Sequence, residues 1–140
     1  MQAYHQLEAE FKSRNIRFTK PRRAIFKCLQ TATYPLSIRD IYTSLPNIDR
    51  TSIYRTLELY LSLGVVQIIP IGWKQKYELA EPYAPHHHHF ICLKCGSHTD
   101  INPPGLEDLL RHYERTAGVI ITAHTFELSG VCAACQQGIQ

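Results

Sequence analysis

The helix that decides the fold of the N-terminal half lies in residues 49–64, which read DRTSIYRTLELYLSLG. Asp49 is a favoured N-cap residue and Gly64 a favoured C-terminal stop, so the stretch predicts one helix between them. Apolar residues such as Ile53 and Leu57 recur at helical spacing and predict a stripe that faces a core. The helix is therefore expected to pack by one side and to expose the other.

The exposed side of this helix carries polar residues that suit the major groove of DNA, namely Thr51, Tyr54 and Arg55. A basic cluster lies upstream, where it is placed to bind phosphates or to enter a minor groove. Its members are Arg14, Arg17, Lys20, Arg22 and Arg23. A charged helix face is often only solvated, so the prediction of a DNA surface depends on the elements around it.

The segments on either side of the helix predict further helices and a β-hairpin. Earlier helices are expected at residues 6–13, at residues 20–31 with Thr19 as N-cap, and at residues 38–45 with Ser37 as N-cap. Residues 65–69 and 73–79 are rich in β-forming side chains, and the turn between them predicts a hairpin. Helices followed by a hairpin are typical of a winged helix-turn-helix, so we expect a DNA-binding domain at residues 1–80.

The second half is expected to form a separate, smaller domain. Residues 81–85 are extended and punctuated by prolines, which predicts a hinge. Strands are expected at residues 90–93, 97–101 and 119–128, with one helix at residues 103–118. The predicted fold class is α+β, with the winged helix followed by a small αβ domain at residues 86–140.

Composition and charge narrow the possible functions. With 140 residues, 44% of them hydrophobic and 19% charged, the chain can bury a core and is not disordered. It has no apolar run long enough to cross a bilayer and opens on polar residues, so we expect a cytoplasmic protein without a membrane partner. Residues 1–80 carry 12 basic against 6 acidic side chains, whereas residues 81–140 carry 3 against 6. The basic half indicates a polyanion partner, and the acidic, histidine-rich half indicates cation binding.

Two Cys-x-x-Cys motifs give the strongest chemical signal of the second half. Their four thiols belong to Cys92, Cys95, Cys132 and Cys135. Four thiolates make the tetrahedral soft-ligand set that zinc favours, and Gly96 directly after the first motif permits a tight turn around the ion. Disulfides or a redox pair are the alternatives, and a cytoplasmic chain without a thioredoxin-like context favours structural zinc.

A run of four histidines, residues 86–89, opens the first strand expected after the hinge. Alternate side chains of an extended chain point to opposite faces, so the pair His86 and His88 and the pair His87 and His89 can serve two separate metal sites. Further ligands are expected on neighbouring elements, at Glu78, Asp100, Glu107 and His124. The alternative is a solvated histidine-rich loop that binds metal weakly.

This ordered set of motifs resembles the ferric uptake regulator (Fur) family of bacterial metal-dependent repressors. The resemblance runs from residues 17–22, through residues 51–57 and the histidine run, to both cysteine motifs, and so covers nearly the whole chain. It implies an N-terminal winged helix and a C-terminal αβ dimerisation domain. It also implies a homodimer that binds palindromic A/T-rich operators when loaded with metal.

The resemblance further implies roles for individual residues. Tyr54 and Arg55 match positions that contact the major groove, and Arg17 matches a minor-groove position. The four cysteines match a structural zinc site. Two other sets match metal sites, one formed by His86, His88, Glu107 and His124, and a regulatory one formed by Glu78, His87 and His89 with Asp100 as the further carboxylate of peroxide-sensing members.

One position departs from the family pattern. Many members have a histidine ahead of the third helix, which supplies a regulatory ligand from the DNA-binding domain, whereas this chain has Tyr34-Pro35. A neutral tyrosine is a poor metal ligand, which leaves Glu81, a water molecule or Glu78 alone to complete the site. The change disfavours peroxide sensing. It leaves zinc and iron open, because Ala80 stands where zinc-sensing members commonly place a cysteine.

The sequence therefore predicts a metal-responsive transcriptional repressor, not an enzyme, that binds operator DNA and controls zinc or iron uptake genes. We expect Zn²⁺ in the structural site and Zn²⁺ or Fe²⁺, with Mn²⁺ as a further candidate, in the regulatory site. A peroxide-sensing member is the alternative within the family. A metal-storage protein or metalloenzyme is the alternative from another class, and neither explains the basic winged helix.

Overall fold

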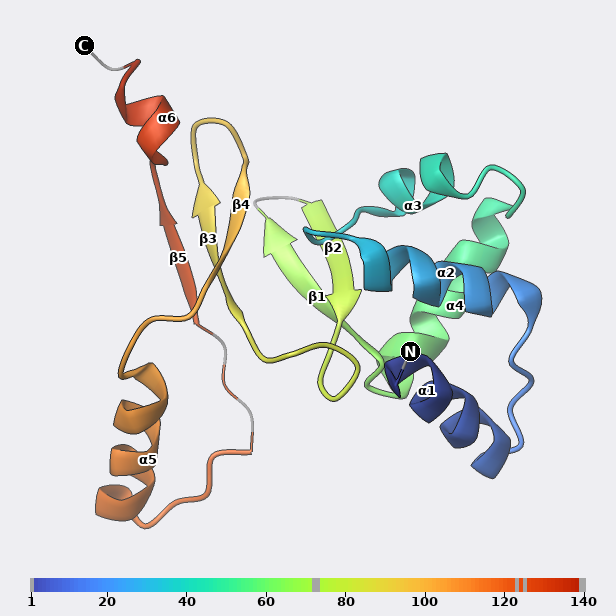
Figure 1. Ribbon diagram of the computed structural model, residues 1–140, viewed down its shortest axis with the longest axis horizontal. Helices are drawn as coiled ribbons and strands as arrows, with labels where there is room; N and C mark the ends of the chain where they lie inside the picture. Colours follow the sequence, from blue (N-terminus) through green and yellow to red (C-terminus); the bar gives the residue numbers. More distant parts are fainter. Residues whose placement is uncertain (1, 72–73, 123, 125, 139–140) are drawn as a thin grey trace. The chain divides into compact units, whose positions relative to one another are not determined.

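The computed structural model describes residues 2–71, 74–122, 124 and 126–138, with the backbone alone for residues 70, 71 and 74. The chain divides into two compact units, Met1–His86 and His87–Gln140, whose elements are labelled in Figure 1. The first unit contains α1 (Gln2–Ser13), α2 (Lys20–Thr31), α3 (Ile38–Ser44), α4 (Arg50–Ser62), β1 (Val66–Ile71) and β2 (Lys74–Leu79). The second contains β3 (His88–Cys92), β4 (His98–Ile101), α5 (Leu106–Ala117), β5 (Glu127–Gly130) and α6 (Ala133–Gln136). The α+β fold class is confirmed.

Side-chain caps set where two of the helices begin. At α3, the Ser37 hydroxyl accepts from the Asp40 amide at 3.2 Å, while the Asp40 carboxylate accepts from the Ser37 amide at 2.8 Å. At α4, Asp49 accepts from the amide of Ser52 at 2.8 Å. Thr19 is the N-cap residue of α2, as predicted, but its side chain makes no capping hydrogen bond, and the first turn of the helix contains a proline with its φ already fixed.

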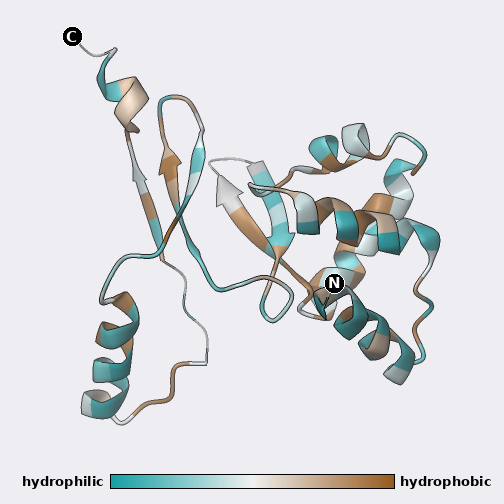
Figure 2. Cartoon of the chain, viewed as in Figure 1, coloured by the Kyte–Doolittle hydropathy of each residue, from teal (hydrophilic) through white to brown (hydrophobic). Residues whose placement is uncertain are grey.

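The core of the first unit lies between α1, α2 and α4. It contains, among others, Leu7, Phe11, Ile25, Phe26, Ile53, Leu57 and Tyr60, all at most 2% exposed. The Tyr60 ring stands edge-on to Phe11 and Phe26, and its hydroxyl donates to the Arg22 carbonyl at 2.7 Å. Figure 2 shows brown and teal stretches side by side along α2 and α4, as expected for helices with one buried face.

Strands β1 and β2 pair as the predicted antiparallel hairpin, with Val66 opposite Leu79. A third segment joins it, because Leu36 and Tyr77 exchange two backbone hydrogen bonds at 2.9 and 2.8 Å. The connection between α2 and α3 is thereby fixed to β2, and the helices and the hairpin form one winged-helix unit.

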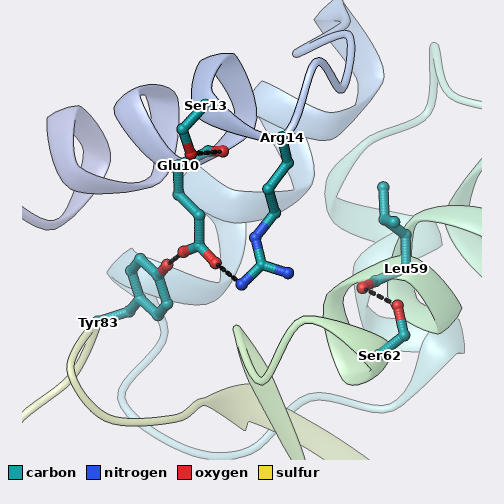
Figure 3. Close-up of polar contacts among 6 residues, drawn as sticks. All are labelled: Glu10, Ser13, Arg14, Leu59, Ser62 and Tyr83. Carbon is teal, nitrogen blue, oxygen red and sulfur yellow. Dashed lines mark hydrogen bonds and ion pairs between the residues drawn. The ribbon is translucent and has the colours of Figure 1, made fainter.

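Residues that follow β2 also pack on the first unit. Tyr83 is 6% exposed and belongs to the core of this unit. Figure 3 shows its hydroxyl directed at the Glu10 carboxylate, to which it donates a hydrogen bond, and Arg14 pairs with the same carboxylate at 2.8 Å. The hinge at residues 81–85 stays a prediction, and Tyr83 within it is anchored to α1.

The second unit is built on a three-stranded sheet in the order β4-β3-β5. β3 runs antiparallel to β4 and parallel to β5, so that Cys92 lies opposite Gly130. A side chain at Gly130 would meet the Phe90 ring, since its Cβ would lie 3.3 Å from that ring. No residue of helix α5 is fully buried within this chain, and Leu109 and Tyr113 are 62% and 59% exposed.

The strand expected at residues 119–128 is largely wrong. Among the described residues of that stretch only Glu127 and Leu128 belong to a strand, and residues 123 and 125 lie outside the described part. Ile120 is 87% exposed, and the Ile121 amide donates to the Glu114 carboxylate instead of to a neighbouring strand. The short helix α6 was not expected. No helix in the described part of the chain has the length and hydropathy to span a membrane.

Candidate DNA-binding surface and metal centres

Helix α4 presents the polar face that the sequence predicts. Ile53 and Leu57 are 0% and 2% exposed, which confirms the inward stripe. Thr51, Tyr54 and Arg55 are exposed on the other side. A helix anchored by one face, with a cation and hydrogen-bonding groups on the other, has the form of a helix that reads a major groove.

The basic cluster ahead of α2 is divided by the structure into two kinds of residue. Arg17 and Lys20 are exposed. The Arg22 guanidinium instead donates to the Arg17 carbonyl and lies over the Phe11 ring. Arg23 donates to the Phe18 carbonyl at 2.9 Å. The sequence predicts that the cluster binds phosphates or enters a minor groove, and nothing in its spacing distinguishes the arginines that bond to backbone carbonyl groups of the protein.

The four cysteines of the two Cys-x-x-Cys motifs come together in the second unit. Their sulfur atoms all lie within 4.8 Å of one another. The first pair sits in the turn after β3, where Gly96 has a φ of 71° and its amide donates to the Cys92 carbonyl at 2.8 Å. The second pair is brought alongside because β5 runs parallel to β3. Four converging sulfurs fit a tetrahedral zinc ion.

The electrostatics of this cluster favour a cation at its centre. The Cys132 amide donates to Cys92 Sγ at 3.3 Å and, with other backbone donors, lowers the pKa of Cys92 to about 6. The Ser97 hydroxyl lowers the pKa of Cys95. In contrast, hydrogen bonding to Cys132 and Cys95 raises the pKa of Cys135 to about 12. Sulfurs this close cannot all be thiolates unless a cation lies between them, and a divalent ion supplies that charge.

A second group of ligands gathers around Glu107, at the start of α5. Glu107 Oε1 lies 3.6 Å from His88 Nε2 and 3.4 Å from His124 Nε2. The rings of His88 and His124 are 5.2 Å apart, and His88 is only 3% exposed. Phe126 packs edge-on against His88 and is a further residue that sequence reasoning missed. Two imidazoles and one carboxylate suit zinc, ferrous iron or manganese.

The other two histidines of β3 and its approach form a separate pair. The rings of His87 and His89 are perpendicular, with centroids 4.7 Å apart. His89 lies opposite Asp100 in the register of β3 and β4, with Nδ1 and Oδ1 3.5 Å apart. His88 and His89, which are neighbours on β3, thus contact two different groups of partners, and the use of these groups as metal sites stays a prediction.

Two predicted ligands belong to the first unit. Glu78 lies on β2, where its carboxylate accepts a hydrogen bond from the Gln67 side chain at 2.7 Å. His86 is the last residue of that unit, and its Nδ1 lies 2.9 Å from the Glu81 carboxylate. Their places in metal sites with residues of the second unit stay predictions.

Comparison with known proteins gives a consistent result. The model of the ferric uptake regulator family matches residues 13–129. The peroxide-responsive repressor PerR of Staphylococcus saprophyticus is 29% identical over 140 residues, covering 94% of this chain and 93% of that protein. PerR of Staphylococcus aureus is 30% identical over 139 residues, with the same shares covered.

Solved structures show the same fold. The ferric uptake regulator Fur of Helicobacter pylori, described as having three functional metal-binding sites, superposes with a TM-score of 0.81 at 22% identity, over 96% of this chain and 92% of that chain. A zinc uptake regulator in complex with zinc and DNA superposes with a TM-score of 0.60 at 24% identity, over 98% and 95% of the two chains.

Proposed function

We propose, because this chain belongs to the ferric uptake regulator family, that it is a metal-responsive transcriptional repressor that binds A/T-rich palindromic operators as a metal-loaded homodimer and controls metal uptake genes. The observation that carries the proposal is the combination, in one chain, of an exposed basic recognition helix with a four-cysteine cluster and a histidine-rich strand. An enzyme or a storage protein has no use for the first of these features.

The winged-helix unit supplies the DNA contacts in this proposal. Tyr54 and Arg55 on α4 enter the major groove, where an arginine can pair with a guanine edge and an aromatic ring can contact thymine methyl groups. Thr51 lies on the same exposed face. Arg17 reaches a minor groove and Lys20 contacts a phosphate. These roles are supported by the exposure of all five side chains.

The second unit supplies the metal chemistry and the dimer. The cysteine cluster holds a structural Zn²⁺ that joins the turn after β3 to the segment after β5. The exposed apolar side chains of α5, such as Leu109 and Tyr113, are covered by the second copy of the chain. In this proposal His88, Glu107 and His124 bind a divalent ion, and His86 is its fourth ligand.

Regulation is proposed to act through ligands from both units. Glu78 belongs to the winged-helix unit, whereas His87 and His89 belong to the second unit. If they share one ion, the winged helices of the dimer are held in the arrangement that fits successive major grooves. Because Tyr34 stands where many members have a histidine, Glu78 carries this coupling, with Glu81 or a water molecule as the further ligand.

The experiment that tests the proposal begins with selection of duplexes from a random pool by the metal-loaded chain. Fluorescence anisotropy of the selected duplex is then measured at fixed salt, in buffered zinc and, anaerobically, in ferrous iron. We expect binding that depends on metal, that is lost in Arg55→Ala with the metal content unchanged, and that loses its metal dependence in Glu78→Ala. A switch at far lower free zinc than free iron would make this a zinc regulator, and a switch by ferrous iron at cytoplasmic levels would make it an iron regulator.

The absence of any selected sequence would overturn the repressor proposal. Unchanged metal dependence in Glu78→Ala would overturn the regulatory mechanism alone. A peroxide-responsive repressor is the second candidate, which the PerR relatives and the pairing of His89 with Asp100 favour. It predicts that hydrogen peroxide abolishes DNA binding of the iron-loaded chain and spares the zinc-loaded chain at low peroxide concentrations, because ferrous iron is oxidised by peroxide whereas Zn²⁺ has no redox chemistry.

A further inference from the structure

The segment that carries Arg17 is short and tightly shaped. It joins α1 to α2 across residues 14–19, and Asn15 within it has a φ of 56°. The Ile16 amide donates to the Phe11 carbonyl at 2.8 Å. The Phe18 ring packs against Phe11, with centroids 5.0 Å apart. The backbone on either side of Arg17 is therefore held, while the Arg17 side chain stays exposed.

Arg23, which lies on α2, connects this segment to α1 as well. From its place on α2, its Nε donates to the Phe18 carbonyl at 2.9 Å, and its guanidinium stacks 5.1 Å from the centre of the Phe18 ring. Its Nη2 lies 3.2 Å from the Glu8 carboxylate on α1. The planar fork of arginine suits such a three-way contact, and a lysine at the same position could make only part of it.

The Arg23 side chain is half exposed, but two of its donors are already directed at the protein: Nε at the Phe18 carbonyl and Nη2 at the Glu8 carboxylate, which faces its charge. A residue that enters a groove from a flexible segment pays the entropy of ordering that segment, and a segment already held avoids this cost. We propose that Arg23, together with Glu8, is a positioning residue that holds the backbone of residues 17–19 so that Arg17 meets DNA in a fixed geometry.

The alternative is that Arg23 is itself a phosphate ligand, as its place in a basic cluster would predict. The two interpretations differ in the sign of one effect. Glu8→Gln removes a negative charge and releases Arg23, so a phosphate ligand would then bind DNA more tightly. A positioning residue loses its anchor in the same variant, and DNA binding weakens although the protein has become more positive.

The test rests on the proposed function and uses the full metal-loaded chain with the duplex selected above. Anisotropy is measured over a series of salt concentrations for the wild type, Glu8→Gln, Arg23→Gln, Arg23→Lys and the matched control Lys20→Gln. Circular dichroism verifies that each variant is folded. The slope of log Kd against log salt reports how many phosphates the protein neutralises. Loss of a residue that only holds the backbone leaves this number, and therefore the slope, unchanged.

We expect Glu8→Gln and Arg23→Gln to raise Kd by about 3- to 10-fold, as for the loss of one ordinary hydrogen bond, with an unchanged salt slope. Arg23→Lys should not restore wild-type affinity. Lys20→Gln should reduce the slope by about 0.9 for each phosphate that the protein no longer neutralises. Tighter binding by Glu8→Gln, or a slope for Arg23→Gln that falls as in Lys20→Gln, would overturn the inference while the wild type still binds. Failure of the wild type to select DNA would instead count against the proposed function.

Discussion

The Tyr60 hydroxyl joins two helices of the first unit by one bond, from α4 to the Arg22 carbonyl in α2. Burial raises the pKa of this phenol, so it stays a donor at every working pH. We predict that Tyr60→Phe, which keeps the buried ring, lowers the free energy of unfolding by about 1 kcal/mol. Urea denaturation followed by circular dichroism measures the change, with Tyr42→Phe as the control at a partly exposed tyrosine. Equal stability of wild type and Tyr60→Phe would contradict the prediction.

Single residues also show where sequence reasoning stops. The inward face of α4 could be predicted, because the spacing of Ile53 and Leu57 is a local property of the helix. The contacts of the Arg22 and Arg23 guanidinium groups with the carbonyl groups of Arg17 and Phe18 could not be predicted, because the fold of residues 14–19 brings those carbonyl groups within reach. A run of basic residues predicts where positive charge lies along the chain, but it does not predict the direction in which each side chain points.

The capping box of α3 is an element whose strength depends on pH. The Ser37 hydroxyl bonds to the Asp40 carboxylate and lowers its pKa below the ordinary value of 3.8. The contribution to stability is therefore complete above that ordinary value and is lost as pH falls through the lowered pKa. We predict that Asp40→Asn costs about 0.5 to 1 kcal/mol at pH 7 and that the difference from wild type shrinks toward pH 3. Urea unfolding at pH 7, 5 and 3 measures it, and a difference independent of pH would refute the charge-based explanation.

Elements that depend only on nearby residues were predicted well. α2, α3 and α4 begin and end within a residue or two of the expected positions, because proline, serine, aspartate and glycine act within one turn. The stretch after α5 was predicted as a strand from its β-forming side chains. A strand also needs a partner strand, and the Ile121 amide instead donates its hydrogen bond to the Glu114 carboxylate of α5.

Both Cys-x-x-Cys motifs can be recognised from their spacing, whereas the parallel pairing of strands that brings them together cannot.

At the scale of the whole molecule, the two units differ in how they are stabilised. Among the described residues of the second unit, the buried side chains are those of His88, His89, Ile91 and Cys92. A domain of this size with so small a core needs a metal or a partner to fold stably. The first unit has an extensive apolar core and needs neither.

We therefore predict that the two units respond differently to metal removal. Chelation of zinc, or Cys135→Ser, should abolish amide protection across residues 87–140 and dissociate the dimer, while residues 1–86 keep their protection. Hydrogen exchange followed by mass spectrometry resolves the two regions, and size-exclusion chromatography reports the dimer. Cys28→Ser is the matched control, because that thiol lies in the first unit, outside the cluster. Uniform loss of protection in both units would contradict this separation.

The zinc cluster joins thiols that are 40 residues apart in the chain, since Cys92 and Cys132 face each other through the pairing of β3 with β5. At synthesis rates of about 5 to 20 residues per second, the first cysteine pair exists for roughly 2 to 8 s before the second pair is made. During that interval the backbone donors that arrive with Cys132 are missing, and two neighbouring thiols stand open to oxidants. Because the second cysteine pair follows β5, the cluster can be completed only near the end of synthesis. Until then, the first pair of thiols depends on a reducing environment to stay unoxidised.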